Sequence, residues 1–212
     1  MHTGHVVPDD LRGLPVWVDR AAAPHGPDSQ THATVIRMAH IVDRVSAHPL
    51  ILQATADALT GLEDAAPRRQ AEAIYWWTKR RVRFVHDPPQ DELLVEPPVL
   101  LSIEDPRGDC DDFSMLLGAM LRAAGIPFEF VTVAGDRSDP QRFSHVYVRA
   151  LLPDGPLVLD ASHGSEPGWE AERHGTVFRK QSCGGDGLVV CRPEVPGLSG
   201  WADDLGLENR GF

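Results

Sequence analysis

Three side chains of the types used in nucleophilic catalysis follow one another along the chain: Cys110, His145 and Asp160. A thiolate is a strong nucleophile, an imidazole can take up its proton, and a carboxylate can orient the imidazole. Each residue type is also common in purely structural positions. The predicted secondary structure around each residue therefore decides whether the three can meet.

Cys110 stands at the start of a predicted helix. Asp109 is a favourable N-cap residue, and Asp112 suits the positive end of a helix dipole. Gly125 can close the helix in a left-handed conformation, and Pro127 prevents its continuation. The apolar residues between these ends recur at helical spacing: Phe113, Leu116, Leu117, Met120, Leu121 and Ala124. We therefore predict a helix from Cys110 with one buried face.

The position of Cys110 favours a reactive thiol over an inert core cysteine. The N–H groups at a helix N-terminus lower the pKa of a thiol from about 8.5 and can also bind an oxyanion. The neighbours Asp109, Asp111 and Asp112 act in the opposite direction, because negative charge disfavours a thiolate. An imidazolium partner is therefore needed. Most free cysteines are buried and unreactive, but Cys110 precedes the apolar face of its helix.

His145 and Asp160 are predicted on neighbouring strands. Residues 144–151 alternate in polarity, which places His145 on the face opposite the valines. Asp160 ends a short apolar strand, and the turn at 153–156 makes the two strands antiparallel neighbours. A single strand histidine or strand-end aspartate is more often structural. The combination with Cys110 is far more specific, because it supplies a nucleophile, a base and an orienting acid.

The remaining elements predict an α+β fold. Helices are expected over 31–47, 49–60 and 67–81, a proline-rich loop over 87–98, and further strands over 128–134, 178–182 and 188–191. Helices followed by consecutive strands indicate an antiparallel sheet packed on helices. We expect an irregular N-terminal arm at 1–28, a catalytic domain at 29–192 with its core motifs at 67–165, and a C-terminal tail at 193–212. Cys183 and Cys191 flank a glycine-rich turn and are expected to face each other, bonded or not.

Composition excludes several functions. The chain has 212 residues and a formal charge of −11, with 31 acidic and 20 basic side chains, so we expect neither nucleic-acid nor anionic-membrane binding. The basic run at 79–83 is interpreted as a solvated helix end. The sequence contains neither a signal-like N-terminus nor an apolar run of about 18 residues. A cytoplasmic location is therefore expected.

Four segments resemble the core of the transglutaminase-like superfamily in order and spacing: Gly108–Phe113, Leu121–Pro127, Ser144–Val148 and Val158–Ser162. The resemblance covers about residues 67–165, includes Tyr75–Trp77 and Val82–Asp87 upstream, and is strongest to the compact bacterial and bacteriophage type. It implies a papain-like arrangement without cofactor or metal, in which Cys110 is the nucleophile, His145 the base and Asp160 the orienting residue. Two tryptophans typical of the family are replaced by Tyr147 and by the segment 157–159. No side chain is assigned to the oxyanion site.

Two functions follow from this resemblance. The first is acyl transfer from a peptide or protein substrate, which makes the chain a peptidase or amidase if water accepts the acyl group and a transglutaminase if an amine does. The alternative is a catalytically silent structural or assembly protein, for example a phage virion component. In that case the N-terminal arm or the C-terminal tail would dock on a protein partner, and the protein would be virion-associated.

Other candidate residues are weaker. His86 adjoins Asp87 but lies in the proline-bounded loop, and His163 is expected in a loop or lining the cleft. A zinc site recruiting Cys110 and His145 lacks the paired spacing of known zinc motifs. The acidic run at 109–112 lacks the glycine and loop spacing of an EF-hand. His2 and His5 are interpreted as a coincidence.

Overall fold

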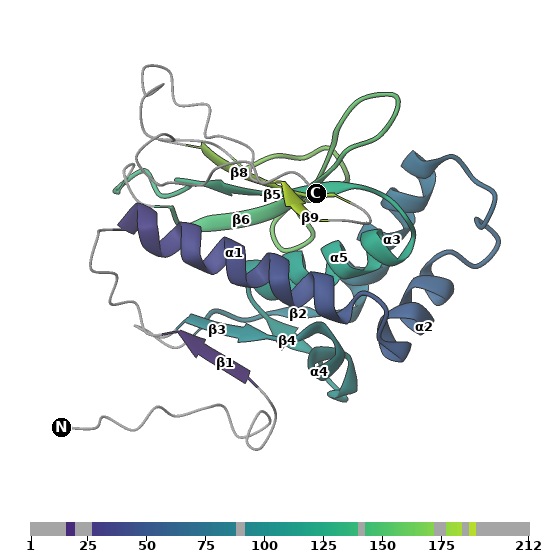
Figure 1. Ribbon diagram of the computed structural model, residues 1–212, viewed down its shortest axis with the longest axis horizontal. Helices are drawn as coiled ribbons and strands as arrows, with labels where there is room; N and C mark the ends of the chain where they lie inside the picture. The colour runs from purple at the N-terminus through teal and green to yellow at the C-terminus, as the bar shows by residue number, and fades with distance from the viewer. Residues whose placement is uncertain are drawn as a thin grey trace.

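The computed structural model describes residues 16–19, 27–87, 92–139, 143–171, 177–183 and 187–189. It has two layers, in which helices cover one face of an antiparallel sheet (Figure 1). The helices are α1 (Pro27–Val45), α2 (Pro49–Ala58), α3 (Pro67–Arg81), α4 (Pro97–Ser102) and α5 (Cys110–Ala123). The strands are β1 (Val16–Asp19), β2 (Arg83–Phe84), β3 (Glu92–Val95), β4 (Arg107–Gly108), β5 (Phe128–Val133), β6 (His145–Ala150), β7 (Leu157–Leu159), β8 (Val177–Cys183) and β9 (Gly187–Val189). The predicted α+β class is confirmed.

The main sheet has the order β7-β6-β5-β8-β9, and all its neighbours are antiparallel. Strand β6 pairs with β7 so that Val148 lies opposite Leu159. Continuing that register by one residue puts Asp160 opposite Tyr147, on the face that also carries His145, because side chains on a strand alternate with period two. The pairing of β6 with β7 therefore brings His145 and Asp160 to one face at the same edge of the domain.

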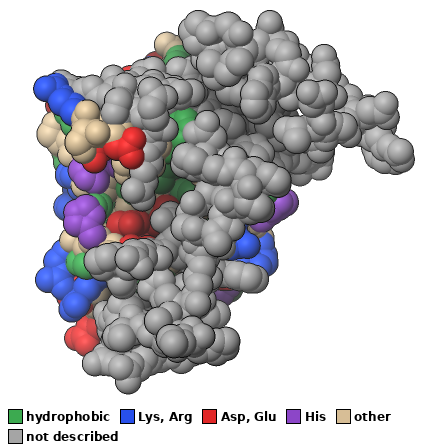
Figure 2. Space-filling model, turned by 90° about the vertical axis from the view of Figure 1, so that its left-hand side faces the viewer, with side chains coloured by type: hydrophobic (Ala, Val, Ile, Leu, Met, Phe, Trp, Pro, Cys, Tyr) green, Lys and Arg blue, Asp and Glu red, His purple; other side chains and the backbone are tan. Residues whose placement is uncertain are grey.

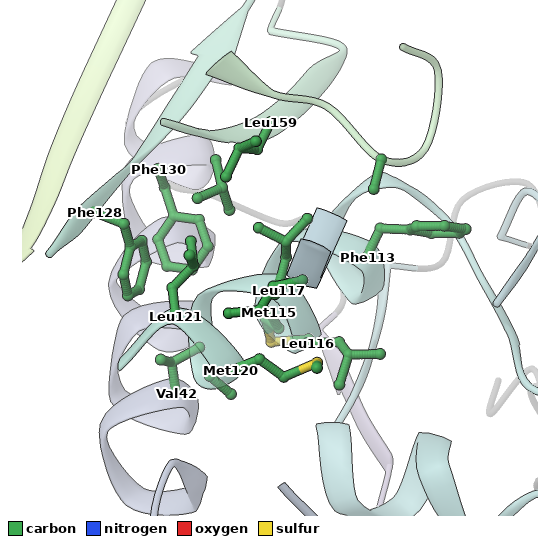
Figure 3. Close-up of a cluster of buried hydrophobic side chains, with 14 of the residues drawn as sticks. Val42, Phe113, Met115, Leu116, Leu117, Met120, Leu121, Phe128, Phe130 and Leu159 are labelled. Atoms are coloured by element: carbon green, nitrogen blue, oxygen red, sulfur yellow. The ribbon is translucent and has the colours of Figure 1, made fainter. Parts of the chain in front are cut away.

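Helix α5 lies at the centre of the core, between the sheet and helices α1, α2 and α3 (Figure 1). Every residue from Asp111 to Leu121 is buried, so the prediction of a single buried face was incomplete. Figure 3 shows its apolar side chains packed against Phe128 and Phe130 of β5. Gly118 permits this contact, because a Cβ atom there would lie 2.8 Å from the Phe128 ring. The helix that begins at Cys110 is thus held on all sides.

Both predicted ends of α5 are confirmed. The Asp109 carboxylate caps the helix by accepting the N–H of Asp111 at 3.3 Å. At the other end Gly125 has a φ of 72°, and Ile126 N–H donates to the Leu121 carbonyl at 2.9 Å. Glycine tolerates a positive φ without the steric cost of a side chain. The local sequence therefore determines where this helix starts and stops.

Two segments differ from the prediction. The proline-rich stretch 87–98, predicted to be a loop, contains strand β3 and the first two residues of the short helix α4. Pro97 and Pro98 suit the first turn of α4, where a missing N–H costs nothing. The expected irregular arm at 1–28 contains strand β1, which pairs with β3, and the first residues of α1. Proline content alone therefore misled the prediction at both places.

The C-terminal hairpin places Cys183 opposite Gly187. The expected contact of Cys183 with Cys191 is not tested, since Cys191 and the tail at 193–212 lie outside the described residues. Among the described helices, none is both long and apolar enough to cross a membrane.

Candidate active site

His145 and Asp160 form a buried pair. The Nε2 atom of His145 donates to Oδ2 of Asp160 at 2.6 Å, and the two side chains are 9% and 0% exposed. A hydrogen bond in such a dry environment is electrostatically stronger than one in water. With its proton on Nε2, a neutral His145 has Nδ1 left as an acceptor. The pairing of His145 with Asp160 predicted from the strands is thus present in the structure.

The carboxylate of Asp160 has a donor for each oxygen. Besides the bond to His145, its Oδ1 accepts the backbone N–H of His163 at 2.9 Å and the Ser162 hydroxyl at 2.9 Å. Burial on its own would raise the pKa of Asp160, but the hydrogen bond and charge of His145 and the other two donors outweigh it. The pKa of Asp160 therefore lies below its ordinary value, and the group is ionised at neutral pH.

Helix α3 fixes the turn that carries Asp160. The hydroxyl of Tyr75 donates to the carbonyl of Gly164 at 2.8 Å, and Lys79 Nζ donates to the carbonyl of Ala161 at 3.3 Å. Burial, followed by the charges of Asp160 and Glu166, raises the pKa of Tyr75 to about 12. Neither contact was predicted from the sequence, in which Tyr75 belonged only to the resemblance and Lys79 to the basic run at 79–83.

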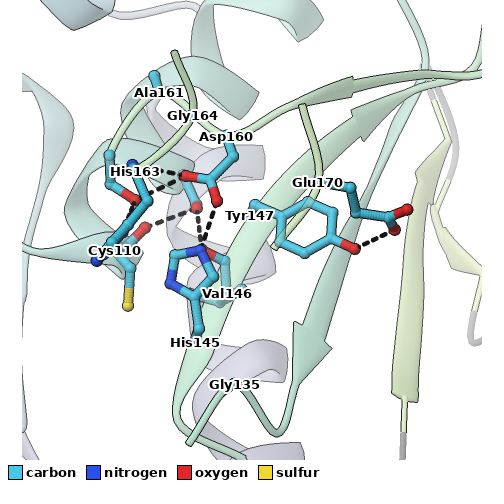
Figure 4. A network of polar contacts seen from close by, with 12 residues as sticks. Cys110, Gly135, His145, Val146, Tyr147, Asp160, Ala161, His163, Gly164 and Glu170 are labelled. Carbon is cyan, nitrogen blue, oxygen red and sulfur yellow. Dashed lines mark hydrogen bonds and ion pairs between the residues drawn. The ribbon is translucent and has the colours of Figure 1, made fainter. Parts of the chain in front are cut away.

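Cys110 is the first residue of α5 and is half-buried. In the view of Figure 4 its sulfur lies on the side of the His145 ring that carries Nδ1, whereas Asp160 lies at Nε2. Ser114, one turn further along, donates to the Cys110 carbonyl at 2.6 Å and lies 3.2 Å from the carbonyl of Val146. One hydroxyl therefore connects the start of α5 to the residue next to His145.

Two of the three acidic neighbours of Cys110 are buried, which the sequence did not indicate. Asp111 and Asp112 are 2% and 1% exposed. Burial, then the charge of Asp109, raises the pKa of both groups. Asp112 accepts the N–H of Val95 at 2.8 Å, whereas Oδ1 of Asp111 meets no donor within the described part of the chain. A raised pKa favours the neutral form of each carboxyl group, which would place less negative charge near the thiol than three ionised aspartates.

Two sets of side chains have ligand atoms within 4.8 Å of one another and could hold a cation: His145, Asp160 and His163, and Asp109, Asp111 and Asp112. In the first set His145 Nε2 already donates to Asp160, whose carboxylate also accepts the backbone N–H of His163. The second set is an acidic cluster at a helix start. The absence of a metal stays a prediction. Figure 2 shows histidine and acidic side chains together on one face of the molecule.

The other histidines have different surroundings. His86 is exposed after β2, and its ring packs edge-on against Phe84 with centroids 4.8 Å apart. His163 lies directly beside His145, and the centroids of the two rings are 4.5 Å apart. The only signal for this neighbour in the sequence was its position three residues after Asp160. His2 and His5 lie outside the described residues.

A groove of about 400 Å³ lies between α2, α3 and α4, away from these residues. Its walls combine apolar side chains such as Leu50 and Trp77 with Arg80 and Arg81. The basic run at 79–83 thus has both solvated and groove-lining members. None of the three candidate catalytic residues lines this groove.

Comparisons with known proteins identify a matching family and several similar structures. The family model of the transglutaminase-like superfamily matches residues 53–161. Similar solved structures include a candidate protease from Parabacteroides distasonis, with 18% identity, a TM-score of 0.43, and coverage of 67% of this chain and 28% of that one. A candidate cysteine protease from Cytophaga hutchinsonii has 16% identity, a TM-score of 0.42, and coverage of 74% and 56%. A TGase has 12% identity, a TM-score of 0.37, and coverage of 69% and 39%.

The chain therefore spans about a quarter and just over half of the first two structures. No curated protein matches it. The family match extends over more than half of the 212 residues and contains the helix start at Cys110, strand β6 and Asp160. The chain belongs to the transglutaminase-like superfamily.

Proposed function

We propose that the protein is a thiol-dependent hydrolase or acyltransferase that acts on amide bonds of peptides or proteins. In this proposal Cys110 is the nucleophile, His145 the base and Asp160 the orienting acid. The observation that supports it most is the buried 2.6 Å hydrogen bond between His145 and Asp160, next to the N-terminus of α5. Family membership agrees with this chemistry.

The first half of the reaction forms a thioester. His145 Nδ1 takes the proton of the Cys110 thiol, and Asp160 stabilises the resulting imidazolium through Nε2. The thiolate attacks the amide carbonyl carbon, and the oxygen that becomes negative lies at the positive end of α5. When the C–N bond breaks, the imidazolium donates its proton to the leaving amine. The products of this half are a free amine and an acyl group on Cys110.

The second half restores the enzyme. A water molecule or a second amine attacks the thioester while His145 accepts its proton. The C–S bond breaks, and the imidazolium returns a proton to the thiolate or remains paired with it. Water yields a carboxylic acid, and an amine yields a new amide. Water is the acceptor we expect unless the substrate excludes it from the site.

The test is to incubate a peptide library with the wild-type protein and with Cys110→Ala. Mass spectrometry then detects hydrolysis, deamidation or incorporation of an added primary amine. We expect one of these products with the wild-type protein and none with Cys110→Ala.

Alkylation by iodoacetamide at pH 7 gives a second readout that needs no substrate. Cys110 should react at least tenfold faster than a free cysteine derivative, since only its thiolate fraction reacts. His145→Ala should remove this advantage, whereas His40→Ala on the exposed side of α1 should retain it. If Cys110 reacts like an ordinary thiol in the wild-type protein, the proposal is wrong and a structural role becomes the better hypothesis.

A further inference from the structure

His163 contacts the candidate base, His145, and also Phe84 in the strand that pairs with the segment before Cys110. Its ring lies edge-on to His145 with centroids 4.5 Å apart and an interplanar angle of 74°. It also lies edge-on to Phe84 at 4.8 Å. Phe84 is in β2, opposite Gly108 of β4, two residues before Cys110. The imidazole of His163 therefore lies between His145 and the strand that pairs with the segment just before Cys110.

The turn holds this ring in a defined orientation. The backbone N–H of His163 and the hydroxyl of Ser162 both donate to Asp160 Oδ1 at 2.9 Å. Since the Ser162 hydroxyl has only one proton and gives it to Asp160, His163 Nδ1–H is the donor in their 2.9 Å contact. His163 and Ser162 thus hold the carboxylate and fix the tautomer of the second imidazole.

Burial and the charges around His163 favour its neutral form when His145 is positive. Its neighbours are His145, Asp160, His86 and Lys79. Burial, and then the positive charge of His145, lower the pKa of His163, whereas Asp160 opposes this effect. A neutral ring does not repel the imidazolium that the reaction needs. It can therefore cover His145 without an electrostatic penalty at neutral pH.

We propose that His163 is a positioning residue, whose ring shields the hydrogen bond between His145 and Asp160 from water while its backbone and Ser162 hold the carboxylate. This inference rests on the proposed function for its catalytic meaning. The shielding itself does not require a reactive thiol. The exposed fraction of the His145 side chain, only 9%, agrees with a ring packed over it.

Two substitutions separate the ring from its charge and polarity. His163→Phe retains a ring that can pack on Phe84 and His145, whereas His163→Ala removes it. Without the ring, water competes for the bond between His145 and Asp160, and the thiolate fraction of Cys110 falls. We expect alkylation of Cys110 at pH 7, relative to pH 9, to fall about tenfold in His163→Ala. In His163→Phe it should stay within about twofold of the wild-type ratio, since shielding persists.

A second measurement tests the shielding without the thiol. In the Cys110→Ala background, NMR measures the exchange of the His145 Nε2 proton with water. Adding His163→Ala should accelerate this exchange about tenfold, and adding His163→Phe should leave it nearly unchanged. If His163→Ala does not fold, His163→Gln, which keeps polarity without a ring, replaces it. Thermal unfolding of each variant checks the fold.

The outcomes are distinguishable. An ordinary reactivity of Cys110 in the wild-type protein overturns the proposed function, and the proton exchange still decides the shielding. Unchanged exchange in His163→Ala overturns the shielding by His163, whatever the thiol does. Equal acceleration in His163→Phe and His163→Ala, with both variants folded, also overturns it, because a ring would then not suffice. Acceleration in His163→Ala alone supports the inference.

Discussion

Asp160 and Asp111 are buried to the same extent, at 1% and 2% exposure, yet their pKa values shift in opposite directions. Asp160 has three donors from His145, Ser162 and His163, and these lower its pKa in spite of burial. Asp111 has an oxygen without a donor in the described structure, and burial raises its pKa. Burial therefore does not decide the charge of a carboxyl group by itself. The donors that the fold supplies decide it.

The same contrast separates the two halves of the candidate site. The base side comprises His145 and the turn from Asp160 to Gly164, where Asp160 is bonded at both oxygens and helix α3 holds the backbone by two further hydrogen bonds. The nucleophile side is the start of α5, where Asp109 caps the helix and Asp111 is buried beside Cys110. A neutral Asp111 places less negative charge near the thiol. The charge of Asp160 thus stabilises a positive His145, and the raised pKa of Asp111 favours a neutral carboxyl group, which would disfavour a thiolate less than a charged one.

The largest effect is expected from removing the charge of Asp160. In Asp160→Asn the imidazolium loses its stabilising carboxylate, so alkylation of Cys110 at pH 7 should fall about 10- to 100-fold, the loss of one charge-assisted hydrogen bond. Any amide turnover detected in the library should fall by about 10³–10⁴. Alkylation rates and mass spectrometry measure both effects.

Asp154→Asn is the matched control for this substitution. Asp154 lies in the turn between β6 and β7 and pairs with Arg68 at the surface, with 59% of its side chain exposed. Surface ion pairs contribute little, so its replacement should leave alkylation unchanged. If Asp160→Asn and Asp154→Asn gave the same rate, the charge of Asp160 would have no role in activating the thiol.

The next largest effect is expected at Gly164, which tests how rigid the base side is. A Cβ atom at this position would lie 2.5 Å from the carbonyl oxygen of Asp160, a backbone atom that no side-chain rotation can move. Gly164→Ala should therefore destabilise the protein by about 3 kcal/mol. Chemical denaturation measures this loss.

Gly61→Ala provides the comparison, since nothing lies within 4 Å of a Cβ atom there and only its positive φ of 75° opposes the substitution. It should cost about 1 kcal/mol. Equal losses in the two variants would show that the turn at Gly164 adjusts freely.

Asp111→Asn should stabilise the protein, in contrast to the two glycine substitutions. Because the folded-state pKa of Asp111 is raised, the folded protein retains a proton that the unfolded chain releases above about pH 4. The free energy of unfolding therefore falls as the pH rises from about 4 to the folded-state pKa of Asp111. The neutral asparagine avoids this loss. We expect Asp111→Asn to be more stable than wild type at pH 7 by on the order of 1–3 kcal/mol, with a smaller difference at pH 4.

Denaturant unfolding at the two pH values measures this difference. Asp57→Asn, on the exposed side of α2, is the control and should change stability little at either pH. The contribution of Asp160 to stability depends on pH in the opposite direction. Its folded pKa is lowered, so its stabilisation is present above the ordinary value of 3.8 and disappears as the pH falls through the folded value. A destabilisation by Asp111→Asn that is equal at both pH values would contradict the neutral state of Asp111.

The elements that carry the site were predictable because local signals determine them. The cap at Asp109, the left-handed Gly125 and the strand alternation around His145 each depend on a few adjacent residues. The pairing of His145 with Asp160 followed from two strands joined by a short turn. These features need little knowledge of the tertiary structure, so the sequence alone was sufficient.

Other features could not be predicted, because they depend on contacts between distant segments. Strands β1 and β3 pair although the whole of α1, α2 and α3 lies between them in the sequence, and no local pattern indicates that contact. The roles of Tyr75 and His163 depend on where a turn and a helix meet in the fold. The raised pKa of Asp111 depends on burial from all sides of α5, whereas the sequence indicated only one apolar face.

The smallest predicted effect concerns Tyr75, which tests whether α3 or the turn itself orients Asp160. Tyr75→Phe keeps the buried ring and removes only the hydroxyl that donates to the Gly164 carbonyl. The loss of one buried hydrogen bond should lower stability by about 1 kcal/mol. The turn keeps its own bonds from Ser162 and His163 to Asp160, so alkylation of Cys110 should change less than about threefold, far less than in Asp160→Asn. A loss of alkylation as large as that of Asp160→Asn would mean that the turn depends on α3 for its shape, and the rigidity of the base side would then come from helix packing instead of its internal hydrogen bonds.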